Sequence, residues 1–328
     1  MTQDLIDASG RVIDYLRISI TDLCNLRCVY CRPPEGVALI PHDEILRYEE
    51  ILKIVSVAGN LGIRKVRVTG GEPLVRRGVL DFLSRLTSMQ GIEDVGLTTN
   101  GVLLVDMARG LKAAGLKRIN ISLDTLRRDV FKKITGGDRL EAVMRGIRAC
   151  LEEGFDPVKI NVVLLAGINE EDLSEFARLT IDLPVDVRFI ERMPFAADEV
   201  PGSPKSLSSG DAVRIIERAA GKLFQEERGP LDGPASMYRL PRAKGRIGII
   251  DPVTGHFCGI CNRMRLTARG TLRPCLLSRS EIDIKAPLRQ GAGLDELAGI
   301  IRSAVAAKPA RSCHGGVGRR DTMNTIGG

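Results

Sequence analysis

The chain has 328 residues, 44% of them hydrophobic, which suits one large folded domain or one such domain with a smaller companion. Its net charge of +7 with only 4% aromatic residues favours a small anionic ligand over a nucleic acid, although a solvated surface would give the same excess. The sequence has neither a secretory leader nor an apolar run of about 18 residues, so we expect a cytoplasmic protein with no membrane partner. Its eight cysteines are then expected to be ligands or unpaired core residues.

The first part of the chain alternates short β-rich runs with helical patterns. Strands are predicted at 16–20, 66–69, 96–99, 119–123, 159–165 and 187–190. Helices are predicted at 49–58, 79–87, 105–114, 140–152 and 172–179. Strands separated by helices form a parallel sheet, and six strands are too few to close a standard barrel. We therefore expect an α/β fold with an incomplete (β/α)6 TIM-like barrel that is open on one side.

The pattern changes after Met193, where prolines and glycines form a linker-like stretch. We divide the chain there into a partial barrel at 1–193 and a carboxy-terminal region at 194–328 that covers the open side. In the second region we expect helices at 212–219 and 294–306, a strand at 246–250, and an irregular segment up to residue 234. The polar end of the chain, which finishes in Gly327 and Gly328, is typical of a frayed tail.

Polar residues collect where the predicted strands end. The motif Gly-Gly-Glu-Pro at 70–73 follows the second strand, Ser122 and Asp124 end the fourth, and 191–193 follow the sixth. In parallel α/β barrels the active site lies at these carboxyl ends. Arg17 and Arg67 lie on strands, where the alternation of side chains allows both to point into the barrel. Buried polar groups at such positions need a ligand or a partner.

Three cysteines, Cys24, Cys28 and Cys31, follow the first strand with the spacing C-x3-C-x2-C, and the next cysteine is Cys150. A [4Fe–4S] cluster normally takes four thiolates, so three leave one iron open to bind another molecule. A closed zinc or iron–sulfur site is the alternative, but it would need a fourth ligand near by. The loop therefore predicts a cluster at which chemistry takes place.

A second set of three cysteines, Cys258, Cys261 and Cys275, lies in the carboxy-terminal region. Cys150 and Cys313 are the remaining candidates for a fourth ligand. Cys150 ends a helical pattern and is expected in the core, whereas Cys313 lies in the polar tail. If neither is a ligand, a second cluster with an open iron can bind a nitrogen or oxygen atom of the substrate. A closed zinc site is the alternative.

Arg263 and Arg265 follow Cys261 at alternating positions. On an extended segment both guanidinium groups point the same way, toward a phosphate or a purine edge. A solvated basic face is the alternative, but the position directly after a cysteine ligand favours binding.

The segment 21–31 together with Gly70-Gly71-Glu72-Pro73 resembles the radical S-adenosylmethionine (SAM) superfamily. The resemblance implies that the open iron binds the amino and carboxylate groups of SAM, and that one electron cleaves it to methionine and a 5′-deoxyadenosyl radical. It also implies close backbone approach at Gly71, pairing of Glu72 with the ammonium group, and contact of Tyr30 with adenine.

Both cysteine sets, the segment Asn-Arg-Met-Arg at 262–265 and the terminal Gly-Gly resemble the molybdenum cofactor biosynthesis protein A family over nearly the whole chain. The resemblance implies two [4Fe–4S] clusters, held by the two cysteine sets, and SAM as cofactors. The implied SAM-binding residues are Tyr30, Gly71, Glu72, Ser122 and Met193. The implied GTP-binding residues are Arg17, Arg67, Thr98, Lys159, Arg263 and Arg265.

The reaction implied is the cyclisation of GTP to (8S)-3′,8-cyclo-7,8-dihydroguanosine 5′-triphosphate, the first step of molybdenum cofactor biosynthesis. The radical takes the ribose 3′ hydrogen, and C3′ attacks C8 of guanine. The implied partners are GTP, a one-electron donor and a downstream cyclic pyranopterin monophosphate synthase, and a homodimer is allowed. The family also implies that the terminal glycines reach toward the active site. No role is assigned to Cys150, Cys313 or His314.

Two other classes of protein are alternatives. A radical enzyme that modifies peptides would also carry clusters after its barrel, but such regions need more cysteines than remain here. A non-enzymatic scaffold would hold zinc at both cysteine sets, and iron and sulfide analysis distinguishes it.

Overall fold

The computed structural model describes residues 4–31, 38–193, 205–229, 232–278, 280–311 and 326. The parallel sheet predicted for the first part of the chain is confirmed. Its six strands are β1 (Tyr15–Ser19), β2 (Lys65–Thr69), β3 (Asp94–Thr99), β4 (Arg118–Ser122), β5 (Val158–Ala166) and β6 (Val185–Glu191). They are neighbours in chain order, as expected for repeated βα units.

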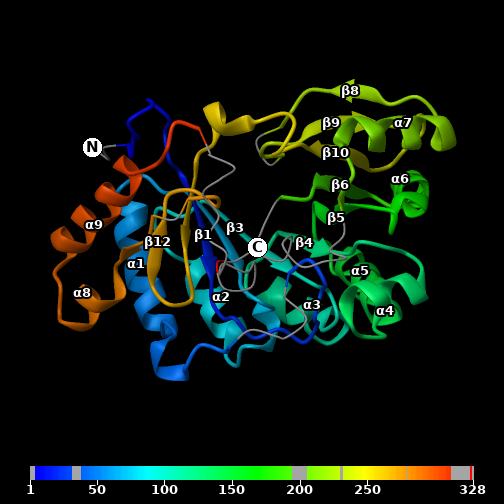
Figure 1. Cartoon of the computed structure of the whole chain (residues 1–328). Coiled ribbons are helices and arrows are strands. Elements are labelled where there is room, and N and C mark those ends of the chain that lie inside the picture. Colours follow the sequence, from blue (N-terminus) through cyan, green and yellow to red (C-terminus); the bar gives the residue numbers. More distant parts are fainter. Residues whose placement is uncertain are drawn as a thin grey trace.

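Helices connect these strands and cover the outside of the sheet (Figure 1). They are α1 (Tyr48–Asn60), α2 (Val79–Thr87), α3 (Leu104–Ala113), α4 (Arg128–Thr135), α5 (Leu140–Glu152) and α6 (Leu173–Asp182). The five predicted helices are confirmed within a few residues. Helix α4 was not predicted, because it is short and four of its eight residues are charged, although Val130, Phe131 and Ile134 are buried. Short 3-10 turns occur at His42–Glu44, Pro73–Val75, Glu170–Asp172 and Phe257–Ile260.

The carboxy-terminal region extends the sheet at both edges. Strand β11 (Arg263–Leu266) pairs in parallel with β1, and β10 (Arg246–Ile250) pairs in parallel with β6. The full order is β13-β12-β11-β1-β2-β3-β4-β5-β6-β10-β9-β8. The sequence predicted a region that covers the open side, but not strands that continue the barrel from its two edges.

The remaining strands belong to these edges, except β7, which pairs with β5. The strands are β7 (Lys205–Ser206), β8 (Phe224–Glu226), β9 (Ser236–Arg239), β12 (Thr271–Arg273) and β13 (Ile282–Asp283). The helices are α7 (Ser209–Ala220), α8 (Lys285–Arg289) and α9 (Leu294–Ala306). Strand β8 lies in the segment that was expected to be irregular, and β9, which follows that segment, was not predicted; β8 pairs with β9 and β9 pairs with β10, so nearby glycines and prolines do not prevent these strands. The predicted helices at 212–219 and 294–306 and the predicted strand at 246–250 are confirmed.

The two faces of the barrel sheet differ in chemistry. Side chains alternate between the faces of a strand. The set under the helices is apolar and buried, and includes Leu16, Ile18, Val66, Val68, Leu97, Ile119, Ile121, Ile160, Val162, Val187 and Phe189. The opposite set, which faces the barrel interior, is mainly polar. The interior of a standard barrel is filled with branched apolar residues, so a polar interior indicates a place for a polar ligand.

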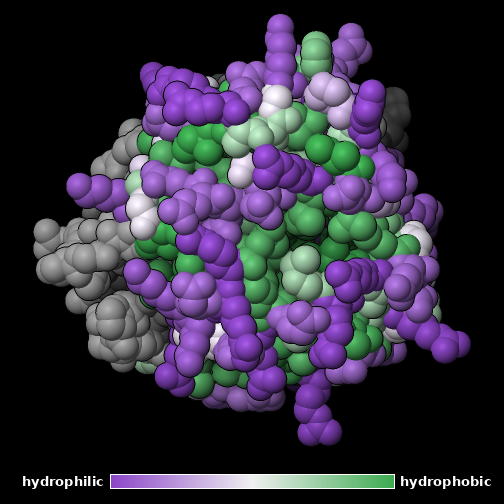
Figure 2. Space-filling model, turned by 90° about the vertical axis from the view of Figure 1, so that its right-hand side faces the viewer, coloured by the Kyte–Doolittle hydropathy of each residue, from purple (hydrophilic) through white to green (hydrophobic). Residues whose placement is uncertain are grey.

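The outer surface is mixed in character. Figure 2 shows the side of the molecule on which α5, α6 and α7 lie in Figure 1, with hydrophilic side chains projecting around partly exposed apolar ones. None of the helices in the described ranges has the length and apolar character needed to cross a membrane.

Candidate active site

A row of cationic side chains crosses the barrel interior. The register of the sheet aligns Arg265 on β11 with Arg17 on β1, then with Arg67 on β2. The row continues through Gly96 on β3 to Arg118 on β4. Residues in register on adjacent strands lie on the same face, so these guanidinium groups converge from four strands.

Gly96 makes room for two of these groups. A Cβ atom at this position would lie 3.0 Å from Cζ of Arg67 and 3.1 Å from Cζ of Arg118. Both arginines are buried, and Nη1 of each has no hydrogen-bond acceptor among the residues that the structure describes. Buried N–H groups without acceptors are costly, so this part of the interior is suited to an anionic ligand.

The electrostatics of the row agree with an anion site. Burial, together with Arg67 and Arg263, lowers the pKa of Arg17 to about 10, although Tyr15 acts in the opposite direction. Burial raises the pKa of Tyr15, but the nearby Arg67, Arg17 and Arg118 outweigh it and bring that pKa to about 8. Nε of Arg67 donates a hydrogen bond of 3.1 Å to the Tyr15 hydroxyl. Arg118 is also paired with the carboxylate of Asp94 on β3, so the positive charge of the row is offset in part.

A second polar row lies beside the first. Thr98, Asn120, Lys159, Asp186 and Arg246 are in register on β3, β4, β5, β6 and β10. Lys159 is fully buried. Burial and the positive charge of Arg188 on β6 lower the pKa of Lys159 to about 6, although the negative charge of Asp186 acts in the opposite direction.

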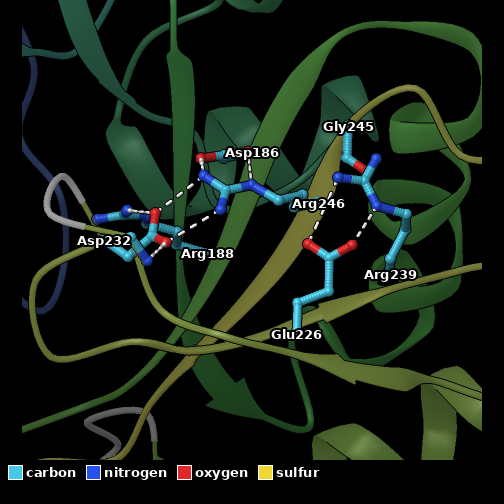
Figure 3. A network of polar contacts seen from close by, with 8 residues as sticks. Asp186, Arg188, Glu226, Asp232, Arg239, Gly245 and Arg246 are labelled. Atoms are coloured by element: carbon cyan, nitrogen blue, oxygen red, sulfur yellow. Dashed lines mark hydrogen bonds and ion pairs between the residues drawn. The ribbon is translucent and has the colours of Figure 1, made fainter.

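Arginines and aspartates form an ion-pair network at this end of the sheet (Figure 3). Arg246 donates to Asp186 at 2.9 and 3.1 Å and to Asp232 at 2.9 Å. Asp232 also lies 3.5 Å from Arg188 on β6. Asp232 is 1% exposed and comes from the carboxy-terminal region. The network thus holds this region against the barrel and places acidic partners beside Arg188.

The first cysteine loop is fixed to the barrel by two neighbouring segments. Backbone N–H groups of Arg27 and Val29 donate to carbonyls of Thr135 and Ile134 at the end of α4, at 2.8 and 2.9 Å. On the other side, Gly71 N–H donates to the Thr21 carbonyl at 2.6 Å. A Cβ at Gly71 would lie 2.3 Å from the Leu23 carbonyl oxygen. The glycine therefore permits the loop and the motif at 70–73 to touch.

Cys24, Cys28 and Cys31 are partly buried and share one electrostatic environment. Burial raises the pKa of Cys28 well above its usual value, and Cys31, Asp124 and Cys24 raise it further. Thiolates become metal ligands when a positive centre offsets this cost. Three thiols on one loop are the donor chemistry of an iron–sulfur cluster, although within the described residues no three such side chains are gathered closely enough to hold a metal ion.

Glu72 supports the turn that carries the glycine pair. Its carboxylate accepts hydrogen bonds from Leu74 N–H, the Thr99 hydroxyl and Asn100 N–H at 3.0, 2.8 and 2.7 Å. Burial raises the pKa of Glu72 to about 7 in spite of these bonds. The sequence did not predict this structural role. Pairing of Glu72 with an ammonium group stays a prediction, for which only part of its acceptor capacity remains.

Of the other residues predicted to bind SAM, Tyr30 lies on the first cysteine loop and Ser122 ends β4, whereas Met193 belongs to the apolar cluster that also contains Cys275 of the second set. The Tyr30 hydroxyl donates to Asp124, and its ring packs beside Val130, Ile134 and Leu165. This packing leaves the Tyr30 backbone as the better candidate for contact with adenine. Ser122 ends β4 on the interior face. Met193, which follows β6, packs against Leu277 and Ile326.

The second cysteine set lies at the β11 edge of the barrel. Cys258 belongs to the turn Phe257–Ile260, Cys261 closes it, and Cys275 follows β12. Burial raises the pKa of Cys261, but Arg263 and Lys308 outweigh it and bring that pKa to about 7. Both Cys275 and Cys261 act on the buried Arg265. This site therefore adjoins the cationic row, and its donor set fits a second cluster.

The other two cysteines and the tail lie only partly within the described residues. Cys150 is 0% exposed in the main core, as predicted. Cys313, His314, Gly327 and Gly328 lie outside the described residues. Ile326 is 3% exposed and packs with Leu277 beside Cys275.

Sequence reasoning missed some interior residues. Arg188 lies at an interior position inside a predicted strand, whereas Tyr15, Arg118 and Asp186 lie one residue before the predicted starts of their strands. A polar residue at every second position of a β-rich run would have identified them. Asp232 gave no such signal, because it lies in an irregular segment.

Comparison with known proteins agrees with this arrangement. The model of the radical SAM superfamily matches residues 18–180, and that of the Molybdenum Cofactor Synthesis C family matches residues 185–313. A relative from Pelotomaculum thermopropionicum named GTP 3′,8-cyclase is 48% identical over 98% of this chain and 99% of its own length. One from Desulforamulus reducens with the same name is 47% identical over 99% of this chain and 100% of its own.

The fold is also found in solved structures. Streptococcus suis SuiB bound to S-adenosylmethionine has a TM-score of 0.60 at 17% identity, covering 94% of this chain and 74% of SuiB. At this identity the likeness shows the fold alone. The full-length relatives and the two family matches together show that the chain belongs to the GTP 3′,8-cyclase family of the radical SAM superfamily.

Proposed function

We propose that this chain is a lyase that cyclises GTP to (8S)-3′,8-cyclo-7,8-dihydroguanosine 5′-triphosphate, the first step of molybdenum cofactor biosynthesis. Its cofactors are SAM and two [4Fe–4S] clusters. The observation that carries the proposal is the row Arg265, Arg17, Arg67 and Arg118, in which Arg17 is partly buried and the others are buried, and which crosses the interior beside the second cysteine set. Relatives that match nearly the full length carry the name of this activity.

The two ends of the nucleotide are assigned to different parts of the interior. Arg17, Arg67 and Lys159 bind the triphosphate, because they are interior cations on β1, β2 and β5, of which Arg67 and Lys159 are buried and Arg17 is partly buried. Charge-assisted hydrogen bonds to phosphate contribute about 1.5–3 kcal/mol each. Thr98 lies between them on β3. Arg263 and Arg265 on β11 bind the purine beside Cys258, Cys261 and Cys275.

SAM is assigned to the first cysteine set. Cys24, Cys28 and Cys31 hold the cluster to which its methionine part binds, and SAM supplies the radical when it is cleaved. Gly71 and the Tyr30 backbone approach it closely, while Ser122, Met193 and Glu72 line the site. The polar interior between the cysteine sets holds GTP, and the helices around the barrel exclude water.

The decisive experiment is an anaerobic assay of the reconstituted protein with SAM, dithionite and GTP. We expect a cyclic product of the same mass as GTP together with 5′-deoxyadenosine, and no product with ATP in place of GTP. Formation of 5′-deoxyadenosine without any GTP-derived product would reject the cyclase while keeping the radical SAM assignment.

We further propose that the protein works in the cytoplasm, receives one electron at a time from a reduced donor, and passes its product to a cyclic pyranopterin monophosphate synthase. Size-exclusion chromatography with light scattering decides whether it acts as a homodimer.

Lys159 gives GTP binding a pH dependence. The pKa of Lys159 is about 6 in the ligand-free interior, where Arg188, Arg118, Asp186 and Asp232 surround it. A bound polyanion favours the charged amine and raises this pKa. Between the two pKa values binding takes up a proton, so affinity falls as pH rises, by up to about tenfold per unit.

Calorimetry of GTP binding between pH 7 and 8.5, in buffers of different ionisation enthalpy, measures this uptake. The Lys159→Met variant is the control, because it shares the titration of the nucleotide itself. Proton uptake that is unchanged in Lys159→Met would contradict the assignment of the proton to this amine.

A further inference from the structure

Two buried cations approach the second cysteine site from parts of the chain outside the barrel. Arg11 belongs to a small hairpin near the amino terminus, closed by the bridge between Ile6 and Val12. Lys308 follows the end of α9. Arg11 and Lys308 are 9% and 5% exposed, which is unusual for such side chains unless they are paired.

Arg11 joins three segments. Its Nε forms an ion pair of 2.6 Å with Asp7, which is itself buried. Its Nη1 donates to the carbonyl of Cys258 at 2.7 Å. Nη2 and Nη1 donate to the carbonyls of Pro309 and Ala310 at 2.7 and 3.2 Å. One guanidinium group therefore fixes the backbone of a cysteine ligand against the segment that carries Lys308.

Lys308 joins the two other ligand segments. Its Nζ donates to the carbonyl of Arg263 at 2.6 Å and to the carbonyl of Pro274 at 2.8 Å. Arg263 lies two residues after Cys261, and Pro274 directly precedes Cys275. The Lys308 ammonium group thus connects the backbone that follows Cys261 to the backbone that precedes Cys275.

The charges of the site agree with these contacts. Burial lowers the pKa of Lys308, and Cys261 and Cys275 act in the opposite direction, so the amine lies within electrostatic range of both sulfurs. A cluster bound by three thiolates carries net negative charge, and its potential depends on the surrounding charge and hydrogen bonds. A buried cation beside it favours both retention and reduction of the cluster.

We propose that Arg11 and Lys308 are positioning residues for the second iron–sulfur cluster, which hold the backbone of its three cysteine segments in place and offset its negative charge. The inference rests on the proposed function only in taking Cys258, Cys261 and Cys275 as cluster ligands. It assigns the amino-terminal hairpin, which precedes the matched family regions, to this site.

The test follows the second cluster alone. In the full chain carrying Cys24→Ser, Cys28→Ser and Cys31→Ser, reconstituted protein is expected to hold about four irons with acid-labile sulfide. Adding Lys308→Met is expected to lower the chelator concentration that removes half of this iron by about tenfold. It is also expected to shift the midpoint potential, followed by electron paramagnetic resonance, to a more negative value.

Conservative variants separate positioning from loss of folding. Lys308→Arg keeps the charge and is expected to restore the potential, whereas Lys308→Gln keeps a donor and restores only part of the iron retention. Arg11→Met is expected to weaken iron retention, and Arg11→Lys to recover part of it. Circular dichroism reports whether each variant is folded.

Lys244→Met is the matched control, because the exposed Lys244 also donates to a carbonyl, that of Asp182, at 3.0 Å. The control is expected to match the parent. Folded Lys308→Met protein with unchanged iron retention and potential would overturn the proposal, as would failure of Lys308→Arg to restore the potential. The iron-retention experiment contains no GTP, so its result stays valid if the cyclase assay fails. A negative result for Lys308→Met, in turn, leaves the cyclase assignment unchanged.

Discussion

Replacing Arg265 by alanine is expected to lower kcat/KM for GTP by about a thousandfold, while reductive cleavage of SAM continues. Arg265 is 6% exposed and lies in register with Arg17 on β1 and Arg273 on β12. Arg265 therefore lies between two other arginines on the strand that borders the second cysteine set. Removing one partner of a buried charge-assisted contact costs about 2–5 kcal/mol, which is the source of the expected factor.

SAM cleavage should survive because the residues assigned to it lie on other segments. The first cysteine loop is fixed by Gly71 and by the end of α4, whereas Arg265 lies on β11, which pairs with β1. The experiment compares cyclic product with 5′-deoxyadenosine in the same reaction. Loss of both products in Arg265→Ala protein that keeps its iron would contradict the separation of the two sites.

Two variants sharpen this comparison. Arg269→Ala is the matched control, because Arg269 lies just beyond β11 but is half exposed and pairs with Glu44 at 2.6 Å. We expect it to keep the activity of the parent protein. Arg265→Lys keeps the charge without the planar fork, so we expect an intermediate activity if the contact is bidentate.

Replacing Gly71 by alanine is expected to abolish SAM cleavage and to halve the iron content from about eight to about four per chain. The new Cβ would lie 2.3 Å from the Leu23 carbonyl oxygen and 2.6 Å from that of Asp22. Both are backbone atoms of the loop that carries Cys24, so a side-chain rotation cannot relieve the clash. The loop would have to move away from the motif at 70–73.

Iron and sulfide analysis, with a cleavage assay, measures this effect. Gly299→Ala in α9 is the control, since no atom lies within 4 Å of the Cβ position there. We expect the control to retain both clusters. A Gly71→Ala protein with full iron content and normal cleavage would show that the loop does not depend on this close approach.

The barrel could be predicted from the sequence because its signals are local. Runs such as 159–165 place apolar residues on one face, and glycines such as Gly115 and Gly154 end the helices between strands. Helix α4 was missed because its buried residues are few. Helix α4 fixes the first cysteine loop, because the carbonyls of Thr135 and Ile134 accept hydrogen bonds from that loop, which lies far away in the sequence.

The cysteine sets could be found from spacing, whereas the charge balance around them could not. Arg265 and Arg17 are far apart in the chain and become neighbours only because β11 pairs with β1. The same holds for Asp232, which reaches Arg246 and Arg188 from an irregular segment. Lys308 looked like the start of a frayed tail, but its amine bridges two backbone carbonyls. Such contacts depend on the closed fold, not on any local pattern.

The pairing of β1 and β6 with later strands has a consequence for biosynthesis of the chain. Both edges of the six-strand sheet find their partners, β11 and β10, only in the last third of the sequence. While the ribosome is still making that third, two strand edges stay unpaired and open to other chains. The order of synthesis therefore makes the nascent barrel dependent on protection until residues 246–266 emerge and complete both edges.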